Sequence, residues 1–148
     1  MTTESRQALL ADTREAMHRE CVVCGRSCAP GLGLDFVAQA DGSVCAQFAC
    51  PSGYEGYQGV LHGGVISSLL DGAMTNCLFA HGIAALTGEL VVRFRHPVAT
   101  GTPISVFGRI VRSTPPLHVM EAHVVQDGVI MAVAKGKFME MQPQGGAP

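Results

Sequence analysis

The long apolar segment at residues 64–80 constrains the fold of this chain more than any other feature. Its hydrophobic side chains occupy nearly every side of the helix that it predicts: Val65, Ile66, Leu69, Leu70, Ala73, Met74, Cys77 and Leu78. A helix that is apolar all round is enclosed by other elements and does not lie on an open surface. The segment therefore predicts a central helix that the rest of the chain wraps.

Most of the remaining chain has the pattern of β-strands. Residues 34–40 and 43–49 flank Asp41-Gly42, a strong hairpin signal, and Asp127-Gly128 marks a second hairpin. After the central helix we expect strands at residues 87–94, 103–113, 117–126 and 129–141. A shorter helix at residues 3–19 precedes the first hairpin. This order predicts an α+β fold in which an antiparallel sheet of five or six strands wraps one long helix.

Length and composition limit the classes of protein to which the chain can belong. Its 148 residues suffice for one domain, 1–148, with an N-terminal helix in residues 1–20 and a flexible tail at 142–148. Hydrophobic residues make up 47% and charged residues 15%, so we expect apolar surface to be buried in a homodimer or a dimer of dimers. The net charge of −2, the lack of a long apolar run and the polar N-terminus predict a cytoplasmic protein without nucleic-acid or membrane partners.

A His-Gly-Gly turn leads into the central helix and indicates a binding site for a negatively charged oxygen. Gly63 and Gly64 leave the backbone N–H groups of the first turn uncovered. Farther along the same helix, Asp71 places a carboxylate among apolar residues, which is costly without a partner or a chemical task. Two simpler interpretations stay open: Asp71 only accepts hydrogen bonds from its neighbours, and His62 only caps the helix.

The spacing of His62 and Asp71 predicts a site that two subunits share. The two residues are nine positions apart, which corresponds to about 13 Å along a helix and about half a turn out of phase. One helix therefore cannot easily bring both residues to one small substrate, whereas a two-fold dimer can bring the amide end of one helix to Asp71 of the other. Ser68 lies on the same polar stripe as Asp71.

The segment from Gly56 to Gly64, followed by Leu69-Leu70-Asp71, resembles the hotdog-fold acyl-CoA thioesterases, in the branch of the phenylacetate-degradation and 4-hydroxybenzoyl-CoA thioesterases. The resemblance implies a hotdog fold and hydrolysis of an acyl-CoA to a free acid and coenzyme A, with no cofactor. It also implies site residues. Asp71 is the general base or the nucleophile, the Gly63 N–H holds the thioester oxygen, His62 orients the carbonyl or the thiolate, and Thr87 holds the attacking water or the carboxylate.

The chain departs from the family pattern at two positions. Gly56 stands where some relatives carry Asn, and Gly72 stands where others carry Glu. These departures keep open the alternative of a hotdog protein that binds acyl-CoA without cleaving it. A hydratase or dehydratase acting on an enoyl-CoA is a further alternative, since His62 and Asp71 could in principle move its two protons. The candidate substrate contacts, of which the arginines would bind coenzyme A phosphates, are Gly64, Gln58, Tyr57, Ser68, Arg93 and Arg95.

Four residues near the N-terminus have the types of a zinc site but an unusual spacing: His18, Cys21, Cys24 and Cys28. Structural zinc sites usually join two separated ligand pairs. The helical geometry predicted before Cys21, which includes His18, would also have to break. We therefore expect free thiols and no bound metal here, and a zinc site stays an alternative.

Overall fold

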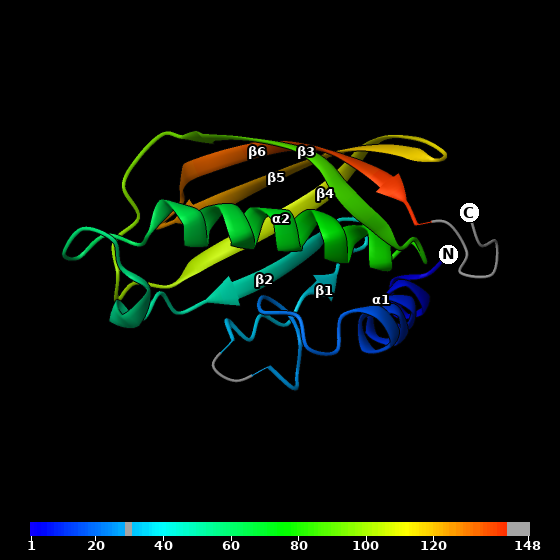
Figure 1. Cartoon of the computed structure of the whole chain (residues 1–148), viewed down its shortest axis with the longest axis horizontal. Coiled ribbons are helices and arrows are strands. Elements are labelled where there is room, and N and C mark those ends of the chain that lie inside the picture. The colour runs from blue at the N-terminus through cyan, green and yellow to red at the C-terminus, as the bar shows by residue number, and fades with distance from the viewer. Residues whose placement is uncertain (29–30, 142–148) are drawn as a thin grey trace, which may run out of the picture.

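Helix α2 (Gly63–Phe79) runs along the inner face of a six-stranded antiparallel sheet that curves around it (Figure 1). This computed structural model describes residues 1–28 and 31–141. The spatial order of the strands is β1-β2-β4-β5-β6-β3. Their bounds are β1 Val37–Ala38, β2 Val44–Phe48, β3 Ala85–Phe94, β4 Ile104–Thr114, β5 Leu117–Gln126 and β6 Val129–Glu140. The predicted α+β architecture with a wrapped central helix is thereby confirmed.

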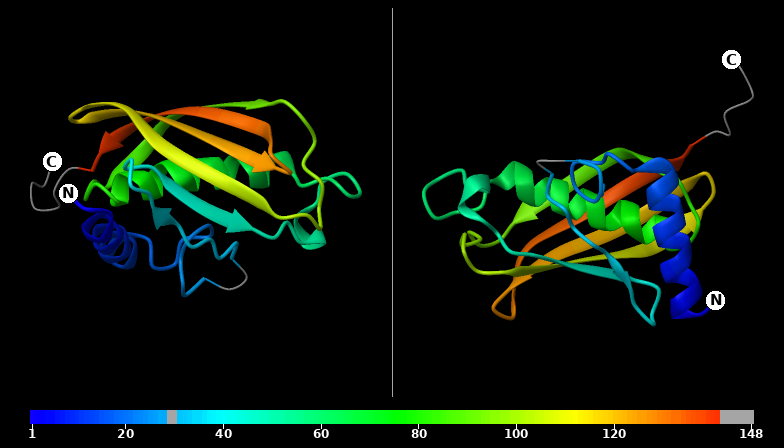
Figure 2. Two further views of the ribbon diagram at one scale, coloured as in Figure 1. Left: turned by 180° about the vertical axis from the view of Figure 1, so that it is seen from behind. Right: turned by 90° about the horizontal axis from the view of Figure 1, so that it is seen from below.

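The N-terminal part of the chain covers a side of α2 that the sheet leaves open (Figure 2). Helix α1 (Thr3–Met17) ends two residues before the predicted limit, with His18 as its C-cap. The ring of His18 then meets Phe79 of α2 edge-on, with 4.9 Å between ring centroids. Val23 packs so closely on Gly72 that a Cβ at that position would lie 2.6 Å from a Val23 methyl carbon. Gly72 thus lets this segment lie against the helix.

Strand β1 is much shorter than the predicted strand at residues 34–40. The N–H of Leu34 bonds the carbonyl of Val23 at 2.9 Å, so residues before β1 pair with the N-terminal segment. The side chain of Gln7 accepts from the Ala38 N–H at 2.7 Å and donates to the Phe36 carbonyl at 3.3 Å. Helix α1 therefore satisfies backbone groups that a longer sheet strand would have used.

Close backbone packing holds α2 against the middle of the sheet. A Cβ on Gly108 of β4 would lie 2.5 Å from the carbonyl oxygen of Ala73. From Leu69 onward most side chains of the helix are buried, and Leu69, Leu70 and Met74 are wholly inaccessible. The helix and the inner sheet face thus form one core.

The turn between β5 and β6 is the predicted two-residue hairpin. Asp127 and Gly128, which form it, both have positive φ, 50° and 77°.

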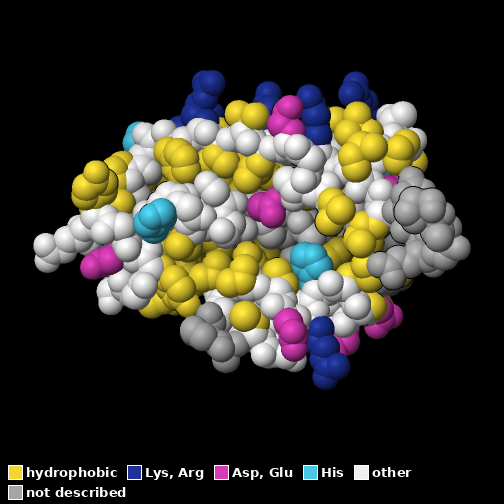
Figure 3. Space-filling model, viewed as in Figure 1, with side chains coloured by type: hydrophobic (Ala, Val, Ile, Leu, Met, Phe, Trp, Pro, Cys, Tyr) yellow, Lys and Arg dark blue, Asp and Glu magenta, His cyan; other side chains and the backbone are white. Residues whose placement is uncertain are grey.

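The surface of the molecule separates apolar from basic side chains. On the face shown in Figure 3, hydrophobic side chains gather in broad bands, and most Lys and Arg side chains project from one edge. No helix in residues 1–28 and 31–141 is long and apolar enough to cross a membrane. The expected tail at 142–148 lies outside the described residues.

Candidate active site

His62 caps the start of α2 and is held in one tautomer by doing so. Its Nδ1 accepts a hydrogen bond from the Gly64 N–H at 2.8 Å, and its carbonyl accepts from the N–H groups of Val65 and Ile66. A neutral imidazole whose Nδ1 is an acceptor carries its proton on Nε2. The exposed ring therefore presents an N–H donor to solvent. The capping interpretation of His62 is confirmed, and its contact with substrate stays a prediction.

The two glycines after His62 have different environments. The N–H of Gly64, also a candidate for substrate binding, is already engaged by His62. The N–H of Gly63 has no hydrogen-bond partner among the described residues. Of the two predicted donors, Gly63 alone is thus available to an oxygen of a ligand, and it lies at the positive end of the helix dipole.

Asp71 lies two turns farther along α2 and is bound by the strand that follows the helix. The hydroxyl of Thr87, in β3, donates to Oδ1 of Asp71 at 2.7 Å. The carboxylate is half-buried. The structure therefore brings together the two residues that the family resemblance paired, and it leaves Oδ2 of Asp71 without a hydrogen bond from the described residues.

Burial is the main influence on the acidity of Asp71. It raises the pKa of the carboxyl above its ordinary value, because the charged form loses hydration. The Thr87 hydroxyl opposes this shift by donating to the charged form, while Cys21 raises and His18 lowers the pKa by their charges. The result is a more basic carboxylate than an exposed aspartate, which suits the removal of a proton from water.

An open pocket of about 680 Å³ lies at the start of α2. Its lining includes Tyr57, His62, Gly63, Ile66, Phe94 and Arg95. Asp71 and Thr87 do not line it. From Gly63 to Asp71 the helix advances about 12 Å, so within one chain the predicted oxyanion donor and the carboxylate lie in separate places, as the sequence spacing predicted.

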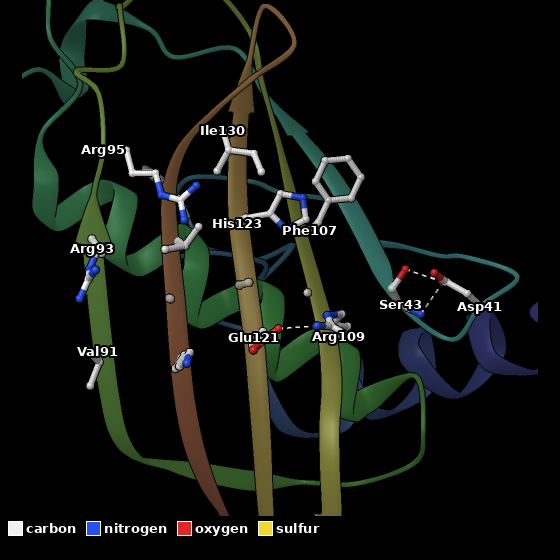
Figure 4. Close-up of a pocket in the computed structure, with 15 residues that line it drawn as sticks. Asp41, Ser43, Val91, Arg93, Arg95, Phe107, Arg109, Glu121, His123 and Ile130 are labelled. Atoms are coloured by element: carbon white, nitrogen blue, oxygen red, sulfur yellow. Dashed lines mark hydrogen bonds and ion pairs between the residues drawn. The ribbon is translucent and has the colours of Figure 1, made fainter.

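Arg93 and Arg95 both line a second pocket, of about 880 Å³, on the outer face of the sheet. Figure 4 shows this pocket in front of the sheet, with α2 passing behind the strands. Arg93 is thus on the sheet face away from the helix, whereas Arg95, just beyond the end of β3, borders both pockets. Of the two predicted phosphate contacts, Arg95 is the one next to Gly63.

Of the other predicted substrate contacts, Tyr57 lines the pocket at the start of α2, and Gln58 and Ser68 do not. Tyr57 is 87% exposed and lines the pocket at the helix start, whereas Gln58 is exposed and does not line it. The hydroxyl of Ser68 donates to the Gly64 carbonyl at 2.9 Å, within its own helix.

Phe94 is a site residue that the sequence reasoning missed. Its ring lies 3.6 Å from where a Cβ on Gly63 would be, so it forms a wall of the pocket beside the free N–H. The alternation of Leu90, Val92 and Phe94 along the predicted strand was the signal that places Phe94 on the helix side of the sheet.

Several solved structures have a fold similar to that of this chain. The Escherichia coli PaaI protein from the phenylacetic acid degradation operon has 19% identity, with 92% of this chain and 96% of that chain covered and a TM-score of 0.77. A thioesterase superfamily protein has 24% identity, with 82% of this chain and 63% of that chain covered and a TM-score of 0.77. A Streptococcus mutans protein solved with acetyl CoA has 21% identity, with 73% of this chain and 88% of that chain covered and a TM-score of 0.68. These structures confirm the hotdog fold.

Comparison at the level of sequence gives the family. No curated protein matches the chain significantly. The family model described as thioesterase superfamily matches residues 58–132, just over half of the 148 residues. This range includes the His-Gly-Gly turn, α2 with Asp71, and Thr87. The chain belongs to the thioesterase superfamily.

Proposed function

We propose that this protein is an acyl-CoA thioesterase whose active sites form between the two subunits of a homodimer. The observation that carries the proposal is that one helix bears both a half-buried carboxylate, Asp71, and an N–H without a partner among the described residues, Gly63. A base and an oxyanion donor are the two groups that hydrolysis of a thioester requires. Membership of the thioesterase superfamily supports this reaction class.

Strand β3 supports the dimer. It ends the sheet, so one of its edges has no strand partner within the described part of the chain. A long edge strand with apolar side chains is a template for pairing with a second chain, and Leu86, Val91 and Phe94 of β3 are each more than half exposed. Antiparallel pairing of two β3 strands across a two-fold axis would continue the sheet and bury this edge.

The same pairing would complete the site. Strand β3 runs from Thr87, bound to Asp71, to Phe94, which lies beside Gly63. A two-fold axis near the middle of β3 would therefore bring the Gly63 end of one subunit toward Asp71 of the other. The acyl group would enter the pocket at the start of α2, and the phosphates of coenzyme A would lie toward Arg95.

The proposed reaction uses water as the nucleophile. Asp71 removes a proton from water while the water oxygen bonds the thioester carbon. The carbonyl oxygen becomes negatively charged and accepts a hydrogen bond from the Gly63 N–H of the other subunit, a contact typically worth about 3–4 kcal/mol in the transition state. The carbon–sulfur bond then breaks, and the coenzyme A thiolate takes up the proton. The Nε2–H of His62 is a donor for the carbonyl or for this thiolate.

A screen for thiol release tests the proposal. Purified protein is incubated with short, long and aromatic acyl-CoAs, and free coenzyme A is measured with a thiol reagent. We expect turnover of at least one class, and a loss of about a hundredfold or more in kcat for Asp71→Asn, because the base is removed and the shape is retained. Equal turnover by Asp71→Asn and wild type would contradict the mechanism.

The same samples separate the alternative functions. Saturable binding of acyl-CoA without thiol release would indicate a binding protein. Formation of a hydroxyacyl-CoA from an enoyl-CoA, again without thiol release, would indicate a hydratase.

A further inference from the structure

Three side chains outside the proposed active site converge next to α2. They are His18, Cys21 and Cys24, and their donor atoms all lie within 4.8 Å of one another. His18 and Cys21 are half-buried, and Cys24 is only 2% exposed. The hydrolysis proposed above uses none of them.

One donor–donor distance in this cluster equals the distance between neighbouring ligands of one metal ion. In a tetrahedral zinc site with ordinary Zn–N and Zn–S bonds, neighbouring donor atoms are separated by about 3.6–3.8 Å. Nδ1 of His18 and Sγ of Cys24 are 3.7 Å apart. The remaining pairs of donor atoms lie within 4.8 Å of one another.

The local backbone also places these ligands. Helix α1 ends at Met17, so the helix that the sequence predicted through residue 19 does not obstruct the cluster. The chain then turns tightly, with Cys21 N–H bonded to the His18 carbonyl at 3.1 Å and Gly25 N–H bonded to the Cys21 carbonyl at 2.8 Å. A Cβ on Gly25 would lie 2.4 Å from the Cys21 nitrogen, so this turn requires glycine.

Neighbouring groups orient the proposed ligands. The Val23 N–H donates to Sγ of Cys21 at 3.4 Å. Partners of this kind orient metal ligands and stabilise their charged form. The edge-on contact of His18 with Phe79 fixes the direction of the imidazole.

We infer that His18, Cys21 and Cys24 bind one Zn²⁺ ion, which ties residues 18–24 to one another where this segment packs on α2. Three protein ligands leave a fourth position, which a water molecule fills. Binding exchanges the two thiol protons for the ion. The inference does not rest on the proposed hydrolysis, because its evidence and its test concern metal alone.

Metal analysis tests the inference. Protein purified under reducing conditions from zinc-supplemented cells should contain about one zinc per chain. After removal of metal with a chelator, added Co²⁺ should produce the absorption bands of a tetrahedral cobalt–thiolate site. Cys21→Ser and His18→Asn should lose most of the zinc and most of the cobalt absorption. Cys45→Ser removes a half-buried thiol elsewhere and should retain both.

The design separates misfolding from loss of the site. If Cys24→Ser fails to fold, as judged by circular dichroism, the cobalt titration of the wild-type protein and of His18→Asn still decides. Wild-type protein without zinc that also fails to bind Co²⁺ would overturn the inference. A disulfide between Cys21 and Cys24 under the same reducing conditions, or equal zinc loss in Cys45→Ser, would overturn it as well.

Discussion

At the scale of single residues, the two neighbouring backbone N–H groups at the start of α2 have different hydrogen-bond partners. The His62 side chain takes the Gly64 N–H, and the Gly63 N–H next to it has no partner among the described residues. One glycine is thus part of the helix cap, and the other is a free donor.

Replacement of Gly63 with proline should remove this donor with little change in structure. Proline is favoured at the first position of a helix, and His62, with φ −60° and ψ 133°, has the backbone conformation that a following proline requires. We expect kcat for thiol release to fall by about a hundredfold or more. Gly63→Ala keeps the N–H, and its methyl group would contact Phe94 at an ordinary 3.6 Å, so its kcat should stay near that of wild type. Equal activity of the two variants would refute the role of this N–H.

The hydroxyl of Thr87 should control the pH at which Asp71 becomes active. It donates to the carboxylate and lowers the pKa of Asp71 against the effect of burial. Thr87→Val removes the bond, so the pKa of Asp71 should rise further. A base acts only when deprotonated, so the acidic limb of the profile of kcat/KM against pH should move to higher pH. Thr87→Ser should leave the limb in place, and an unshifted limb in Thr87→Val would count against the pairing.

At the scale of elements, α2 is positioned by glycines that let its backbone approach its neighbours. Gly108 in β4 lies against the carbonyl of Ala73, and Gly72 lies against Val23 of the N-terminal segment. The helix is thereby held between the sheet and residues 18–25, with Asp71 next to both contacts.

A methyl group at Gly108 should destabilise the protein. It would lie 2.5 Å from a backbone oxygen that cannot move without shifting the helix, so Gly108→Ala should lower the free energy of unfolding by about 1–3 kcal/mol. Urea denaturation measures this loss as a lower midpoint. Gly53→Ala is the matched control, because nothing lies within 4 Å of a Cβ at that position. Equal midpoints for the two variants would mean that α2 does not approach β4 so closely.

At the scale of the whole molecule, a shared active site allows two defective subunits to restore each other. In a dimer of one Asp71→Asn chain and one Gly63→Pro chain, one site has both defects and the other has none. Random assembly of equal amounts makes half of the dimers mixed, so coexpression should recover roughly a quarter of the wild-type activity. Each variant alone should be almost inactive. Coexpression that gives only the sum of the separate activities would place the whole site within one subunit.

Local patterns in the sequence determined the elements and the order in which they occur. The all-round apolar helix, the Asp-Gly turns and the alternating segments predicted α2 and the strands that follow it within a few residues. The spacing of His62 and Asp71 also predicted two separate half-sites. These features depend on residues a few positions apart, whose interactions are the same in any fold that contains the element.

Only the tertiary structure decided what lies next to these elements. It shortened β1, where Gln7 and Val23 bond backbone groups of the residues before the strand, and it brought Thr87 to Asp71. It also placed Arg93 on the sheet face away from α2 and gathered His18, Cys21 and Cys24 into one cluster. Each of these contacts depends on how distant segments pack or on where a turn directs a side chain. The periodicity of a single element determines neither the packing nor the direction of a turn.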